Sequence, residues 1–191
     1  MSCLQLFSLV IAYLLGSFPA GYLLSWLAIK KDLFSIGSGN IGGMNVLRNV
    51  NWKAGLVTIA LDITKGATAA LIVRHTLGPK WGWLALPAAI CGHNWMPWLG
   101  FRGGKGLSVG WGALLVLNWP IAIWTAILLL LLLLILRNDD LAIMTLCPAF
   151  FLLLLLLEGS YPVLGAGVLA ALEVFIKTFT QKRSLKNAMQ K

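Results

Sequence analysis

Long apolar segments alternate with short polar ones along almost the whole chain. The apolar segments cover approximately residues 4–29, 54–73, 81–95, 107–136, 141–157 and 163–176. A helix of about 20 apolar residues crosses the hydrocarbon core of a bilayer, and a helix satisfies its own backbone hydrogen bonds in lipid. The pattern therefore predicts an all-α integral membrane protein with a single membrane domain over residues 1–191.

Turn-forming residues set the number of helices. The segment 107–136 is too long for one span, and Asn-Trp-Pro at 118–120 near its middle predicts two helices joined by a tight turn. A glycine- and proline-containing patch at 16–21 predicts a kink or a close helix contact in the first span rather than a break. A short connection ending at Gly-Pro, residues 78–79, separates the second and third spans. Together these features predict seven transmembrane helices.

Composition and charge narrow the interpretation. The chain is 59% hydrophobic and 11% charged, with a mean hydropathy of +0.86, which is outside the range of soluble domains. The net charge of +9 raises the question of nucleic-acid binding, but the charges cluster in short segments between apolar runs, so no nucleic acid is expected. Arg74 and Lys80 are the only lysine or arginine residues in the predicted outer segments. By the positive-inside rule, the N-terminus then lies outside and the C-terminus in the cytoplasm.

A polar stretch lies between the first two apolar segments at residues 37–48, which read GSGNIGGMNVLR. Glycines let backbone N–H groups turn toward a ligand, and Arg48 can hold two oxygens of a phosphate. A second polar stretch, 92–106, ends in Gly103-Gly104-Lys105-Gly106, which is typical of a phosphate cradle but lacks the spacing of a nucleotide P-loop. If each span reverses direction, both stretches lie on the cytoplasmic side and form a joint anion site.

Four further side chains have two interpretations each. His93 is either a general base or a packed hydrogen-bonding residue, and Ser38 is either a nucleophile or a phosphate-binding hydroxyl. Asp62 and Lys65 lie three residues apart on one helical face, either as a self-neutralising ion pair or as a pair directed at the site. The three widely spaced cysteines indicate neither a disulfide framework nor a metal site.

The two glycine-rich stretches and the intervening Asp62-x-x-Lys65-Gly66 resemble the membrane glycerol-3-phosphate acyltransferase family that uses acyl phosphate as its donor. The resemblance implies a seven-span enzyme of the bacterial inner membrane with a cytoplasmic active face. It implies acyl transfer from acyl phosphate to glycerol 3-phosphate, giving lysophosphatidic acid and phosphate, among membrane lipids and without a cofactor or metal.

The resemblance also implies roles for individual residues. Catalytic roles fall on Ser38, Arg48 and Lys105. Substrate-binding roles fall on Gly37, Gly39, Asn40, Gly42, Asn45, His93, Gly103, Gly104 and Gly106. Supporting roles fall on Asp62, Lys65, Thr178 and Gln181.

The chain departs from the family pattern at several positions. Thr178 and Gln181 stand where the family has His and Asn, Met44 stands in place of Thr, and Phe34 stands in place of Arg. The sixth span opens with Asp140 and apolar residues instead of a serine-containing pattern. These departures leave a second hypothesis, a non-catalytic or accessory membrane paralogue that keeps the phosphate-binding loops. A small transporter is a third, although the polar residues lie in surface loops rather than along a pore. The sequence does not predict the oligomeric state.

Overall fold

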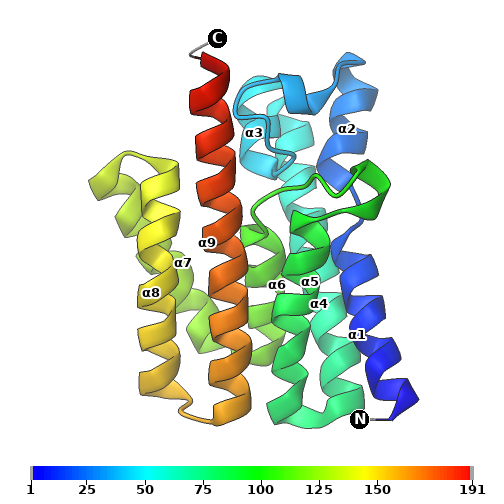
Figure 1. Ribbon diagram of the computed structural model, residues 1–191, viewed down its shortest axis with the longest axis vertical. Coiled ribbons are helices and arrows are strands. Elements are labelled where there is room, and N and C mark those ends of the chain that lie inside the picture. The colour runs from blue at the N-terminus through cyan, green and yellow to red at the C-terminus, as the bar shows by residue number, and fades with distance from the viewer. Residues whose placement is uncertain (1, 190–191) are drawn as a thin grey trace.

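The chain forms a bundle of helices in the computed structural model, which describes the backbone of residues 2–189 and the side chains of residues 2–182 (Figure 1). The α-helices are α1 (Cys3–Gly16), α2 (Ala20–Ile29), α3 (Gly43–Asn49), α4 (Trp52–Trp81), α5 (Ala85–Asn94), α6 (Leu107–Leu117), α7 (Trp119–Leu136), α8 (Asp139–Leu157) and α9 (Tyr161–Met189). Short 3-10 helices lie at Leu33–Ser35, Gly82–Leu84 and Pro97–Leu99. Within residues 2–189 the sole strand-like pairing is an isolated bridge between Met96 and Arg102. The predicted all-α class is confirmed.

Five apolar segments of the described chain are long enough to cross a membrane, namely Cys3–Ile29, Trp52–Asn94, Trp119–Leu136, Asp139–Leu157 and Tyr161–Lys182. The segment Trp52–Asn94 contains both α4 and α5, which pack against each other, and α6 is a shorter apolar helix. Large apolar side chains point away from the bundle, as on α7, where Leu134 is 64% and Ile135 is 74% exposed. Such surfaces suit lipid rather than water. The protein is therefore an integral membrane protein, and the count of seven spans stays a prediction.

The first apolar segment is broken, not merely kinked. α1 ends at Gly16 and α2 begins at Ala20, because Pro19 has no N–H with which to continue the helix. The prediction of a kink without a break is wrong here. The predicted close contact is confirmed: a Cβ on Gly16 would lie 2.1 Å from the carbonyl oxygen of Ala89 in α5.

Three other boundaries test the pattern. α4 continues through Arg74, where a polar connection was expected, and the chain leaves helical geometry only at Gly78, whose φ is 81°. Residues 43–48 of the first polar stretch, together with Asn49, form the helix α3 rather than a loop. The turn predicted at 118–120 is confirmed, since the side chain of Asn118 caps α7 by accepting from the N–H of Ile121 (3.2 Å).

Glycines bring α4 and α6 into backbone contact. A Cβ on Gly66 would lie 1.9 Å from the carbonyl oxygen of Val109, and a Cβ on Gly112 would lie 2.0 Å from that of Ile63. Small residues allow this close approach of helices in a membrane. The contact places the start of α6, which follows the second polar stretch, beside α4. The loops of both stretches lie toward the end of the bundle that carries the C-terminus, and the N-terminus lies at the other end (Figure 1).

Candidate active site

The side chain of Asn45, on α3, organises the first polar loop. Its Oδ1 accepts from the backbone N–H of Ser38 (3.1 Å), and its Nδ2 donates to the carbonyls of Ile36 (3.0 Å) and Asn40 (2.7 Å). Asn49, one turn further along α3, donates to the same Oδ1 (2.9 Å). The loop is therefore folded around one buried amide, which holds Ser38 at a fixed place.

Two glycines allow this tight path. Gly37 and Gly39 have φ values of 56° and 62°, a region that residues with a Cβ rarely adopt. A Cβ on Gly37 would also lie 2.4 Å from Asn45 Oδ1. The glycines predicted from the motif are thus required by the shape of the loop.

The second polar loop is fitted against His93. The N–H of Gly104 donates to the carbonyl of His93 (3.0 Å), and a Cβ on Gly103 would lie 2.1 Å from that oxygen. A Cβ on Gly104 would lie 2.1 Å from His93 Nε2. Gly106, with φ 81°, is the N-cap residue of α6. This packing fixes the backbone on both sides of Lys105.

A buried ionic cluster lies beneath the loops. Lys65 Nζ is 2.8 Å from Asp62 Oδ1 and 3.0 Å from His93 Nδ1, and it donates to the carbonyl of Phe18 in the break between α1 and α2 (2.9 Å). An ammonium group can only donate, so His93 Nδ1 accepts and the ring proton of a neutral imidazole is on Nε2. Asp62 and Lys65 form the predicted ion pair. Asp62 also lines the cavity described below, so the two interpretations of this pair are compatible.

The two cations of the motifs are paired with successive carboxylates. Arg48 Nη1 lies 2.5 Å from Asp139 Oδ2, and Lys105 Nζ lies 2.5 Å from Asp140 Oδ1. Both aspartates occupy the first turn of α8, where the helix dipole favours negative charge. The four side chains therefore carry no net charge as a group.

A polar cavity of about 630 Å³ connects the two motifs. Predicted site residues on its wall are Ser38, Asn40, Gly42, Asn45, Arg48, Asp62, His93, Lys105 and Gly106. The remaining predicted residues do not line it: Gly37, Gly39, Lys65, Gly103, Gly104, Thr178 and Gln181. Most residues of this second group contact residues of the cavity wall and hold them in place, as the contacts above show for the glycines and for Lys65.

The two predicted residues of α9 have different surroundings. Thr178 is buried, and its hydroxyl donates to the carbonyl of Val174 within its own helix (2.8 Å). Gln181 instead reaches both loops, because it accepts from Asn40 Nδ2 (3.2 Å) and donates to the carbonyl of Gly103 (3.2 Å). Within the described residues, the Thr178 hydroxyl therefore makes no hydrogen bond to the motifs that would replace one from a histidine.

Sequence reasoning missed several residues of the wall. Asn49, Ser108, Asn138, Asp139 and Asp140 all line the polar cavity. A signal was present for the last three, because in the predicted topology the segment 137–140 is an inner loop, on the same side of the membrane as both motifs. Asn-Asp-Asp is also an ordinary start for a helix, so this signal did not stand out.

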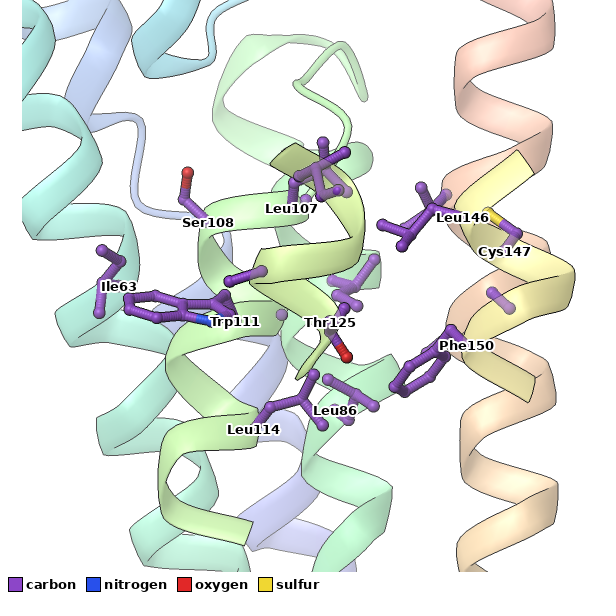
Figure 2. Close-up of a pocket in the computed structure, with 18 of the residues that line it drawn as sticks. Ile63, Leu86, Leu107, Ser108, Trp111, Leu114, Thr125, Leu146, Cys147 and Phe150 are labelled. Carbon is purple, nitrogen blue, oxygen red and sulfur yellow. The ribbon is translucent and has the colours of Figure 1, made fainter. Parts of the chain in front are cut away.

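An apolar groove of about 400 Å³ continues from the polar cavity into the bundle. The two hollows share Gly106, Leu107 and Ser108 at the start of α6, Leu129 and Leu133 on α7, and Ile59 on α4. Figure 2 shows Leu86 and Leu114 on one side of the groove and Leu146 and Phe150, from α8, on the other. The groove is lined almost entirely by hydrocarbon.

These features define a helical integral membrane protein whose polar cavity and apolar groove fit a molecule with an anionic head and a hydrocarbon chain. The model of the glycerol-3-phosphate acyltransferase family matches residues 6–190. The chain belongs to this family.

Individual relatives agree with the family match. The chain is 40% identical to a glycerol-3-phosphate acyltransferase of Cereibacter sphaeroides ATCC 17025 over 181 residues, which is 95% of this chain and 86% of that protein. The relative from strain ATCC 17029 is 47% identical over 114 residues, 60% of this chain and 57% of its own length. Crystal structures of PlsY, an integral membrane glycerol 3-phosphate acyltransferase, are similar with 29% identity over 96% of this chain and 92% of PlsY. The TM-scores are 0.86 for its glycerol 3-phosphate form and 0.83 for its lysophosphatidic acid form.

Proposed function

We propose that the protein transfers an acyl group from acyl phosphate to glycerol 3-phosphate, giving lysophosphatidic acid and inorganic phosphate. The observation that carries this proposal is the junction of the polar cavity with the apolar groove at residues 106–108. A donor with its phosphate in the cavity and its chain in the groove has its reactive carbonyl at this junction. Glycerol 3-phosphate is small and polar and fits the remaining part of the cavity.

The two cations and the glycine loops bind the phosphates in this proposal. Arg48 and Lys105 lie on the cavity wall and are the charged groups that phosphate requires. The hydroxyl of Ser38, which lines the cavity, supplies a further donor. Two substrates that each carry a phosphate then lie side by side, which brings the acceptor hydroxyl close to the carbonyl.

The reaction needs no nucleophile from the protein. The acceptor hydroxyl oxygen attacks the acyl carbon and forms the new ester bond, and the bond from that carbon to the phosphate oxygen breaks. The hydroxyl proton passes to the departing phosphate. Negative charge develops on the carbonyl oxygen during the attack, so positioned donors at the junction lower the barrier. His93 lines the cavity, and its Nε2–H is one such donor.

The proposed placement in the membrane follows from the same features. The seven spans are α1 with α2, then α4, α5, α6, α7, α8 and α9. The N-terminus lies outside and the C-terminus in the cytoplasm of a bacterial cell, with the cavity at the cytoplasmic face of the inner membrane. Support comes from the basic segments, and from the polar loops at the end of the bundle that carries the C-terminus (Figure 1).

The test is turnover by the purified protein. Palmitoyl phosphate and glycerol 3-phosphate should give lysophosphatidic acid and phosphate in equal amounts, and palmitoyl coenzyme A in place of the donor should give none. Lys105→Ala and Arg48→Ala should lower kcat/KM. If the wild-type protein forms no more product than these two variants, the proposal is refuted. Retained binding of radiolabelled acyl phosphate without product would then support a non-catalytic paralogue, and uptake into sealed vesicles would support a transporter.

A further inference from the structure

We propose that Gln181 is a positioning residue that sets the distance between the two substrate-binding loops. The inference rests on the proposed function, because it explains how two half-sites act on two substrates at once. Gln181 lies near the C-terminal end of α9 and does not line the polar cavity. Its effect on the reaction is therefore exerted through the loops that it contacts.

The side chain joins the loops through a continuous chain of hydrogen bonds. The N–H of Gly42 donates to Asn40 Oδ1 (2.8 Å), and Asn40 Nδ2 donates to Gln181 Oε1 (3.2 Å). Gln181 Nε2 then donates to the carbonyl of Gly103 (3.2 Å). One end of this chain is in the loop of Ser38 and the other end is two residues before Lys105.

The backbone groups at both ends fix the direction of every bond. The N–H of Gly42 can only donate, which makes Asn40 present its oxygen there and its NH₂ to Gln181. The carbonyl of Gly103 can only accept, which requires the NH₂ of Gln181. Both requirements are met by one orientation of each amide. Residue 181 must therefore accept on one side and donate on the other, and a carboxylate of the same length cannot do both.

The helix that carries Gln181 is itself anchored beside the second loop. Lys177, one turn earlier on α9, donates to the carbonyl of Asn94 (2.5 Å), and its Nζ lies 5.5 Å from the ring centre of Trp95. This contact holds α9 against the end of α5, where the second polar stretch begins. The amide chain thus ties the first loop to a helix that is already fixed against the second.

The expected kinetic effect is on alignment and not on the binding of either substrate. Gln181→Glu keeps the length and the acceptor but loses the donor to Gly103, and Gln181→Met keeps the length and loses both. We expect kcat to fall by about tenfold to a hundredfold, the effect of a misplacement of roughly 1 Å. KM for each substrate should stay within about twofold, because each half-site keeps its own contacts. Lys182→Met, which changes the exposed neighbouring side chain, should leave kcat and KM unchanged.

Four results would overturn the proposal. Full kcat in Gln181→Glu would show that donation to Gly103 has no role. A raised KM with unchanged kcat would identify Gln181 as a substrate contact. Equal losses in Lys182→Met, or unfolding of both Gln181 variants in the detergent used, would show that this end of α9 is only a structural support.

A second measurement does not depend on turnover. Hydrogen exchange followed by mass spectrometry should show faster exchange in peptides 36–49 and 96–106 of Gln181→Met together, compared with the wild type and Lys182→Met. Faster exchange confined to α9 would overturn the proposal. An inactive wild-type protein would refute the acyl-transfer function while this measurement still decides the role of Gln181.

Discussion

Replacing Asp140 by Asn should strengthen the binding of a phosphate-bearing substrate. Asp140 Oδ1 is 2.5 Å from Lys105 Nζ, and both side chains line the polar cavity. A substrate phosphate that binds Lys105 must displace this carboxylate and then lie close to it. Asn keeps the shape of the side chain and removes both the competing ion pair and the repulsion between like charges.

The structure gives the size of the effect. The paired side chains of Lys105 and Asp140 are 15% and 27% exposed, so the pair is neither deeply buried nor free in solvent. An exposed pair contributes up to about 1 kcal/mol, and two charges about 4 Å apart interact by about 4 kcal/mol at an effective dielectric constant of 20. A cost of about 2 kcal/mol lies between these limits. It corresponds to a decrease of roughly 30-fold in the dissociation constant.

The assay is direct binding of glycerol 3-phosphate and of a non-hydrolysable acyl phosphate analogue to detergent-solubilised protein, together with both KM values. At least one of the two dissociation constants should fall in Asp140→Asn. Asp32→Asn, in the loop after α2 and not on the cavity wall, is the charge-matched control and should change neither. Weaker binding in Asp140→Asn would refute the reasoning and show that the carboxylate holds Lys105 in its binding position.

Three other changes test the site and its support. Gly104→Ala places a Cβ 2.1 Å from an imidazole nitrogen and should lower kcat/KM by about a hundredfold in the turnover assay, whereas Gly165→Ala, with open space around it, should have no effect. Lys65→Met leaves the buried Asp62 unpaired and should lower the stability by about 3–5 kcal/mol in thermal or denaturant unfolding, and combining it with Asp62→Leu should recover part of this loss. Leu114→Trp fills the groove about 10 Å below its mouth and should decrease turnover of long-chain donors more than that of short-chain donors; equal losses for all chain lengths would contradict this route for the chain.

The membrane fold was largely predictable from the sequence because lipid restricts the backbone to a few solutions. Apolar length predicted the long helices, and Asn118 with its neighbours predicted the turn between α6 and α7. The break at Ser17–Pro19 was not predictable. Pro19 interrupts the helix, and Lys65, far away in the sequence, donates to the carbonyl of Phe18 inside the gap, a contact that the sequence does not show. A proline in a membrane helix produces a kink or a break according to such partners.

The candidate site was likewise predictable from the sequence in one part and not in another. The motifs and the family resemblance pointed to residues that face the cavity, such as Ser38, Arg48 and Lys105, because glycine-rich and basic patterns are typical of phosphate sites. They did not identify what holds these residues. Asn45 was expected to bind substrate, which stays a prediction, and its amide makes four hydrogen bonds to its own loop and helix that the motif did not predict. The partners of a buried amide are set by tertiary contacts, which the sequence of one chain does not show.

The net charge of the sequence does not show that the cations of the site are paired with carboxylates. A net charge of +9 suggests a positive field that attracts phosphate, yet Arg48 and Lys105 are each neutralised by an aspartate of α8. Under the proposed function, we expect affinity for a dianion to come from exchanging a carboxylate for a phosphate at short range. If a long-range field dominated, Asp139→Asn and Asp140→Asn would strengthen binding equally. Exchange predicts a smaller gain for Asp139→Asn than for Asp140→Asn. The side chains of Arg48 and Asp139 are 53% and 45% exposed, so their ion pair contributes at most about 1 kcal/mol, which is roughly fivefold in affinity. Equal gains in affinity in the two variants would therefore refute the exchange model and support a dominant long-range field.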